Sequence, residues 1–91
     1  MSNPKLGIIG GGQLGSLLSE AAKSLNVETV ILADDINAPA KNFTKSFICG
    51  NYEDENLINE FISKVDLVTF EFENIPYKIL KNINNYKPVL P

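Results

Sequence analysis

Two groups of residues in the sequence have the types and spacing that ligand chemistry requires. The first is a glycine-rich turn, GGGQLG at residues 10–15, which directly follows a short apolar run. Glycines at positions 10, 12 and 15 permit a tight turn, a close approach of backbone to a ligand and close packing of the helix that follows. Backbone N–H groups at such a helix start form a natural site for an anion or a polar ligand. The sequence therefore predicts a ligand-binding turn here.

The second group is the segment TFEFENIP at residues 69–76. Strand alternation places Phe70 and Asn74 on one side of this segment and Glu71 and Glu73 on the other. In a doubly wound parallel sheet, the carboxyl end of a strand faces the ligand crevice. Glu73 lies nearer the lip of that crevice, so we expect Glu73 rather than Glu71 to contact a ligand. The plain alternative is that one or both carboxylates are merely solvated.

The elements that must position these groups begin with a buried strand at residues 5–9, which ends on the glycines. Helical spacing of apolar residues predicts a helix over 13–25. Its expected apolar face is Leu14, Leu17, Leu18, Ala21, Ala22 and Leu25, and its expected polar face is Ser16, Ser19, Glu20 and Lys23. A β-branched run at 27–33 predicts a second strand, which leads into a turn holding Asn37 and Pro39.

The second half of the chain continues the alternation of strands and helices. We expect a third strand at 47–49, a helix with the apolar stripe Leu57, Ile58, Phe61, Ile62 and Val65, a fourth strand at 66–72, a helix over 77–84, and a fifth strand that begins at 87–91 and is cut off. The acidic residues 53–55 suit the positive end of the second helix. This order predicts an α/β fold, with a Rossmann-like parallel sheet flanked by helices and right-handed crossovers, as one domain over residues 1–91.

The charge, the apolar runs and the residue counts of the chain exclude several classes of function. The net charge of −3, without a lysine or arginine cluster, argues against nucleic acid as the main partner. No apolar run approaches the roughly 20 residues of a membrane span, and the N-terminus lacks a signal peptide, so we expect a cytoplasmic protein. The chain has no histidine and one cysteine, Cys49, which we expect to be a small buried residue. These counts predict neither a zinc-type metal cluster nor an imidazole acid or base in this chain.

The glycine turn by itself has more than one interpretation. A Walker A loop is excluded, because Ser16 follows Gly15 where the phosphate-binding lysine would stand. The NAD-binding half of a dehydrogenase stays open, since Asp34 and Asp35 lie about 20 residues beyond the turn, where a ribose-binding acid is expected. The simpler account of both aspartates is a solvated turn with an Asx-type hydrogen bond. A nonenzymatic ligand-binding module, or glycines that serve only helix packing, are further alternatives.

Three segments together carry a resemblance to a known family. They are KLGIIGGGQLG at the start, NAPA after the second strand and VTFEFENIP at the fourth. In this combination the chain resembles the N-terminal, pre-ATP-grasp domain of the carboxyaminoimidazole ribonucleotide synthetases, which are ATP-grasp enzymes of purine biosynthesis. The glycine turn alone is weakly specific, whereas EFENIP at this distance from it is strongly so. The dehydrogenase interpretation offers no account of that segment.

The resemblance implies an ATP-dependent ligase. In such an enzyme ATP phosphorylates bicarbonate, and the carboxyphosphate delivers its carbon to the exocyclic amine of 5-aminoimidazole ribonucleotide, with Mg²⁺ required. It also implies that ATP and Mg²⁺ bind mainly in later domains, that the complete protein is a homodimer, and that this 91-residue chain is a truncated piece without activity of its own.

The resemblance further implies that this domain holds the ribonucleotide. The substrate-binding positions that it carries over are Gly12, Gln13, Leu14, Glu73 and Asn74. The sequence departs from the family pattern at two places. Ser16 stands where the family usually has arginine, and residues 33–36, ADDI, replace a DPDP-like run. The first departure removes any contact of that arginine, and the second indicates that substrate does not bind the acidic turn.

Overall fold

In the part of the chain that the structure describes, the fold is a five-stranded parallel sheet covered by helices on both faces. The structure is a computed structural model that describes residues 4–10, 12–70 and 75–90. The strands lie in the order β3-β2-β1-β4-β5, and every neighbouring pair is parallel. The strands are β1 (Lys5–Ile9), β2 (Glu28–Ala33), β3 (Ser46–Cys49), β4 (Leu67–Phe70) and β5 (Val89–Leu90). The predicted α/β class and parallel sheet are confirmed.

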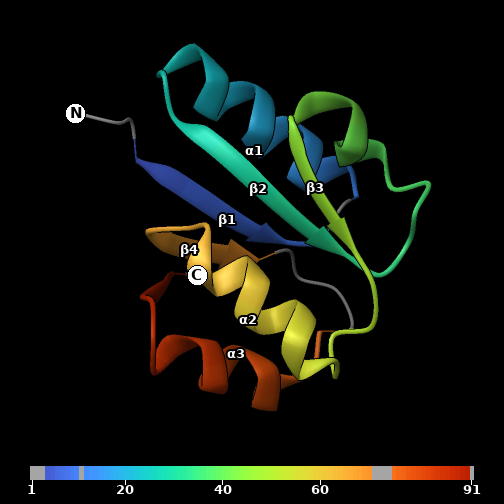
Figure 1. The fold of residues 1–91 in the computed structure, drawn as a ribbon. Coiled ribbons are helices and arrows are strands. Elements are labelled where there is room, and N and C mark those ends of the chain that lie inside the picture. Colours follow the sequence, from blue (N-terminus) through green and yellow to red (C-terminus); the bar gives the residue numbers. More distant parts are fainter. Residues whose placement is uncertain (1–3, 11, 71–74, 91) are drawn as a thin grey trace.

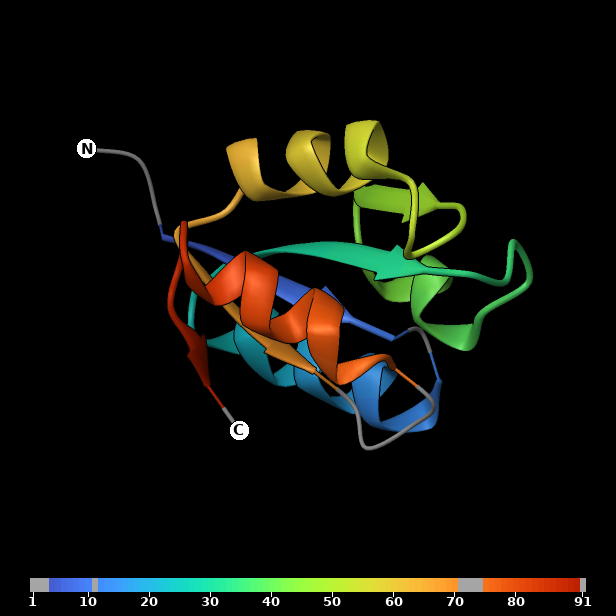
Figure 2. The ribbon, with the colours of Figure 1, turned by 90° about the horizontal axis from the view of Figure 1, so that it is seen from below.

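The helices divide between the two faces of the sheet. They are α1 (Gln13–Ser24), the 3₁₀ helix η1 (Pro39–Phe43), α2 (Glu55–Ser63) and α3 (Tyr77–Asn84). In Figure 1, α1 and η1 lie above the strands and α2 and α3 below them; in Figure 2, seen from below, α3 lies in front of the strands and α1 behind them. The sheet is therefore a middle layer between two helical layers, as in a doubly wound fold.

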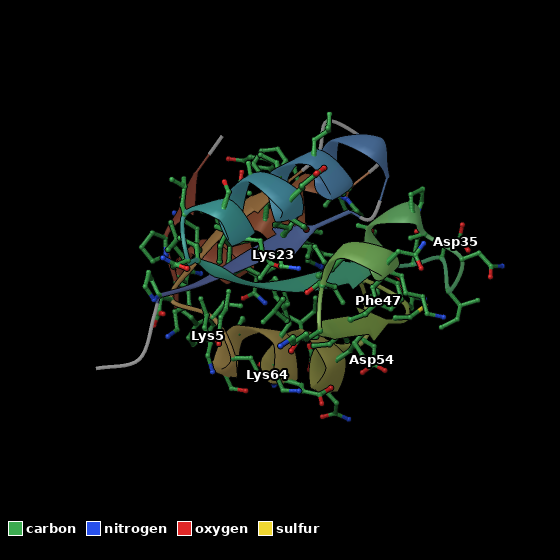
Figure 3. All side chains as sticks on the ribbon, turned by 90° about the horizontal axis from the view of Figure 1, so that it is seen from above. Lys5, Lys23, Asp35, Phe47, Asp54 and Lys64 are labelled. Carbon is green, nitrogen blue, oxygen red and sulfur yellow. The ribbon has the colours of Figure 1, made fainter. Side chains whose placement is uncertain are left out.

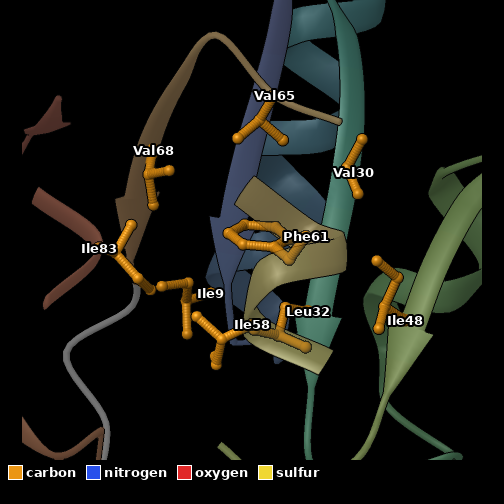
Figure 4. Packing of buried hydrophobic residues seen from close by; sticks show 9 residues of the cluster. All are labelled: Ile9, Val30, Leu32, Ile48, Ile58, Phe61, Val65, Val68 and Ile83. Carbon is orange, nitrogen blue, oxygen red and sulfur yellow. The ribbon is translucent and has the colours of Figure 1, made fainter. Parts of the chain in front are cut away.

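The larger hydrophobic core lies between the sheet and the two helices α2 and α3. Its centre is Phe61, which is fully buried and lies across β1 among aliphatic side chains from the strands (Figure 4). This approach requires a glycine in β1. A Cβ atom built on Gly7 would lie 2.5 Å from Cζ of Phe61 and 2.8 Å from Cγ1 of Val65, too close for real atoms. Gly7 thus lets α2 pack directly on the central strand.

The smaller core lies under α1, and it corrects part of the sequence prediction. Leu18 and Ala22 face the sheet as expected, but Leu17 is 63% exposed and Leu25 is 74% exposed. Ser19, expected on the polar face, is 1% exposed instead, and its hydroxyl has no hydrogen-bond partner among the described residues. The helical period was correct, but the line of α1 that meets the sheet is rotated toward its small residues, which permit close helix-to-sheet packing.

Local hydrogen bonds fix where the helices end and begin. Asn26 adopts φ 60°, and its N–H bonds the Lys23 carbonyl while the Val27 N–H bonds the Ala22 carbonyl. This is a Schellman motif with asparagine in the left-handed position. At the start of α2, the Asp54 carboxylate accepts hydrogen bonds from the N–H groups of the second and third helical residues. The acidic stretch at residues 53–55 therefore includes a helix N-cap.

Two further predictions need correction. The predicted turn is present at Asn37, but Pro39 is the first residue of the 3₁₀ helix η1, a favoured position for proline. Ala38 and Ala40 are buried against the sheet, so this short helix contributes to the smaller core. Cys49, expected to be buried, is half-buried, because β3 is an edge strand with an open side.

We expect Gly7→Ala to lower the free energy of unfolding by about 1–3 kcal/mol, because the added methyl group forces Phe61 and Val65 out of a packed core. Gly50→Ala is the matched control. There the new Cβ would meet only the side chain of Leu57, at 2.7 Å from its Cδ2 atom, and that half-buried side chain can turn away. Denaturant unfolding monitored by circular dichroism measures both losses. Equal losses in the two variants would refute the constraint at Gly7.

Candidate functional site

The strand order places a topological switch point between β1 and β4. From β1 the chain proceeds through β2 to β3 on one side, and it then crosses to β4 on the other side. The carboxyl ends of β1 and β4 lie side by side, with Ile9 paired to Phe70. In open α/β sheets, ligands bind in the crevice outside the strand ends at such a point. The candidate site is therefore this carboxyl edge of the sheet.

The glycine turn lies at this edge, as the sequence predicts. Gly10 has φ 108°, a backbone conformation that residues with a side chain rarely adopt, and its N–H donates to the Leu32 carbonyl at 2.7 Å. This bond ties the turn to the end of β2. Gly12 is the N-cap of α1, and the first turn of that helix contains no acidic residue. The positive end of the helix dipole therefore points to the candidate site, and no acidic residue of that first turn offsets it.

The predicted contact residues differ in what the structure describes. Gln13 and Leu14 form the first turn of α1, so their backbone lies at the carboxyl edge, but their side chains lie outside the described part. Glu71, Glu73 and Asn74 lie outside the described residues altogether. The roles assigned to all of these side chains therefore remain predictions.

The two aspartates after β2 behave as the simpler interpretation predicts. The Asp35 carboxylate accepts a hydrogen bond from the Asn37 N–H at 2.9 Å, and its carbonyl accepts one from the Ala38 N–H at 3.1 Å. This is an Asx-type turn, and both Asp34 and Asp35 are exposed. Figure 3 shows Asp35 toward one end of the molecule and Lys5 toward the other. Asp35 thus has a local structural role that requires no ligand.

A groove of about 970 Å³ lies at the opposite, amino-terminal edge of the sheet. Its lining includes Lys23, in the last turn of α1, and Lys64, which directly follows α2. Lysines at these positions counter the negative ends of the helix dipoles. Lys64 also pairs with Glu60 at 3.6 Å, and the carboxylate of Glu28 lies in the same lining. These lysines are therefore explained by the fold, and the groove is not part of the candidate site.

Two properties of the described residues bear on the function classes. No group of three or more histidine, cysteine, aspartate or glutamate side chains within residues 4–10, 12–70 and 75–90 is placed to hold a metal ion. Over the same residues, no helix combines the length and apolar character needed to cross a membrane.

The fold and the glycine turn together define the class of protein domain. A parallel sheet of order β3-β2-β1-β4-β5, with a glycine turn at the switch point, is a nucleotide-binding type of α/β domain. Within that class, the model of the ribonucleotide synthetase preATP-grasp domain matches residues 3–91. The chain therefore belongs to the family of ribonucleotide synthetase preATP-grasp domains, and the dehydrogenase interpretation is not retained.

The relatives agree with this assignment. An N5-carboxyaminoimidazole ribonucleotide synthase of Staphylococcus epidermidis is 37% identical over 78 residues, which are 86% of this chain and 21% of that protein. The N5-carboxyaminoimidazole ribonucleotide synthetase structure from Thermus thermophilus superposes with a TM-score of 0.89 at 32% identity, covering 94% of this chain and 24% of that one.

A third relative is the N5-carboxyaminoimidazole synthase of Aspergillus clavatus, solved in complex with ADP and 5-aminoimidazole ribonucleotide. It superposes with a TM-score of 0.82 at 29% identity, covering 99% of this chain and 24% of that one. The chain thus spans about a fifth to a quarter of the length of the relatives that it matches.

Sequence reasoning missed one participant in the site. The Leu32 carbonyl holds the glycine turn in place, but it is a backbone atom of an apolar strand residue. No side-chain type or spacing marks such an atom, because any residue at this position presents the same carbonyl group. Only the pairing of β1 with β2 brings it to the turn.

We expect Gly10→Ala to destabilise the protein by about 1–2 kcal/mol, because a Cβ atom is strained at φ 108°. Gly12→Ala is the comparison: Gly12 has φ −77°, which alanine adopts without strain, so its loss should be smaller and should come only from the less favourable helix N-cap. Thermal or urea unfolding measures both values. If Gly12→Ala cost as much as Gly10→Ala, backbone conformation would not be the reason for glycine at position 10.

Proposed function

We propose that this chain is the ribonucleotide-binding part of an ATP-dependent ligase that carboxylates 5-aminoimidazole ribonucleotide with bicarbonate in purine biosynthesis. The observation that carries the proposal is the glycine turn, held by the Gly10 hydrogen bond at the switch point of a ribonucleotide synthetase preATP-grasp domain. A relative of this fold was solved with ADP and 5-aminoimidazole ribonucleotide. That relative supports the choice of ligand.

The proposed contacts combine neutral dipoles with one carboxylate. Backbone N–H groups at Gly12, Gln13 and Leu14 meet polar groups of the ribonucleotide, and the Gln13 amide adds both a donor and an acceptor. Glu73 accepts hydrogen bonds from ribose hydroxyls, and Asn74 contacts the ligand beside it. None of these groups transfers a proton or attacks the substrate. The role of this chain is therefore to bind and orient the ribonucleotide.

The remaining components belong, in this proposal, to the rest of the ligase. Relatives of this fold were solved with ADP or with ATP. We propose that ATP and Mg²⁺ bind mainly outside these 91 residues, that bicarbonate is the second substrate, and that the complete ligase is a homodimer in the cytoplasm. ATP, when bound there, supplies the phosphoryl group that activates bicarbonate.

We expect the purified 91-residue chain neither to hydrolyse ATP nor to consume 5-aminoimidazole ribonucleotide, because it spans only a fifth to a quarter of its relatives' length. A coupled assay for ADP formation, with and without bicarbonate and Mg²⁺, measures this. Turnover by the purified chain would show that the chemistry lies within these residues.

In the complete ligase, we expect Glu73→Gln to lower kcat/KM for the ribonucleotide about 10- to 150-fold, because a hydrogen bond to a charged group contributes roughly 1.5–3 kcal/mol. The KM for ATP should stay nearly unchanged. The matched control is Glu71→Gln, which should change the barrier by no more than about 0.5 kcal/mol if Glu71 is solvated. Steady-state kinetics with each substrate varied separately measures both. A larger loss in Glu71→Gln would assign the contact to the wrong glutamate.

A further inference from the structure

Tyr77 is a large aromatic side chain that is 77% exposed. It is the first residue of α3, directly after Pro76, which is the N-cap. Its neighbours Ile75, Ile79 and Leu80 pack against the larger core, whereas Tyr77 is not among the side chains of that cluster. Burial in the described core therefore does not explain an aromatic residue at this position.

Topology places Tyr77 at the same edge of the sheet as the glycine turn. Because α3 connects the parallel strands β4 and β5, it runs back against the strand direction, from the carboxyl edge to the amino edge. Its first residue therefore lies on the carboxyl side, and Tyr86, which follows its last turn, lies on the amino side. The beginning of α3 is the orange end of that helix in Figures 1 and 2.

The chemistry of the side chain fits the unassigned part of the ligand. The contacts proposed above engage the polar groups of the ribonucleotide and leave its flat heteroaromatic ring without a partner. A tyrosine ring offers a flat apolar face, and stacking of a base on such a face contributes substantially to binding. In the sequence, Tyr77 also lies four residues after Glu73, the proposed ribose contact.

We propose that Tyr77 is a specificity residue whose ring stacks on the aminoimidazole ring of the bound ribonucleotide. This inference rests on the proposed function, because it takes the ligand and its edge of the sheet from there. Tyr77 discriminates ligands that carry an aromatic base from those that carry only the sugar phosphate. It takes no part in the transfer chemistry.

The experiment compares two ligands and three variants in the complete ligase. Isothermal titration calorimetry without ATP gives the Kd for 5-aminoimidazole ribonucleotide and for ribose 5-phosphate, which lacks the ring. We expect Tyr77→Ala to raise the Kd for the ribonucleotide about 5- to 150-fold, the range that corresponds to removal of a stacking aromatic side chain. The Kd for ribose 5-phosphate should remain the same. Tyr77→Phe, which keeps the ring, should retain the affinity for both ligands.

The control variant is Tyr86→Ala, which removes a tyrosine of similar exposure, 67%, from the opposite edge of the sheet. It should leave both Kd values unchanged. Unchanged ribonucleotide affinity in Tyr77→Ala would overturn the proposal, and so would an equal loss for both ligands, which would indicate a general disturbance of the site. Failure of the unsubstituted ligase to bind the ribonucleotide would instead overturn the proposed function.

Discussion

The close approach of Phe61 to Gly7 determines how the two halves of the sheet are joined. Gly7 lies in the central strand, paired with Val30 on one side and Val68 on the other. The Phe61 ring occupies the space that a side chain at Gly7 would need (Figure 4). Since α2 leaves β3 at one edge of the sheet and leads to β4 beyond β1, packing it on the central strand carries the chain across the sheet. The switch point follows from that crossing.

The switch point in turn aligns the strand ends that form the candidate site. At the amino ends of β1 and β4, the Lys5 N–H bonds the Asp66 carboxylate at 2.8 Å, and the Asp66 N–H bonds the Lys5 carbonyl at 2.8 Å. This reciprocal pair fixes the register that brings Ile9 level with Phe70 at the other end. Because of this register, the glycine turn begins beside the end of β4. A shift of one residue would turn every side chain of β4 to the opposite face.

The sequence predicted most of the fold because its apolar periods are unambiguous. The predicted helix at 77–84 matches α3, and β2 and β3 lie within one residue of their predictions. The apolar periodicity predicted the buried face of α1 incorrectly at two residues. Leu17 is exposed and Ser19 is buried because of how closely α1 approaches the sheet, and no local sequence pattern encodes that distance. The helix η1 was missed because its alanines show no helical stripe. The glycine turn of the candidate site could be predicted, because glycines indicate an unusual backbone conformation. The Leu32 carbonyl that holds the turn could not be predicted, because a backbone atom has no side-chain signal in the sequence.

The distribution of charge limits how the proposed ribonucleotide site attracts an anion. A ribonucleotide carries a phosphate, yet this chain has a net charge of −3, and four of its lysines line the groove at the edge opposite the glycine turn. Ser16 adds no cation at the turn. At the carboxyl edge, an anion is attracted by the N–H dipoles at the start of α1, which act over about one helical turn, and by Lys78, the second residue of α3. For the proposed ribonucleotide site, this chain therefore supplies short-range geometry rather than a strong positive field.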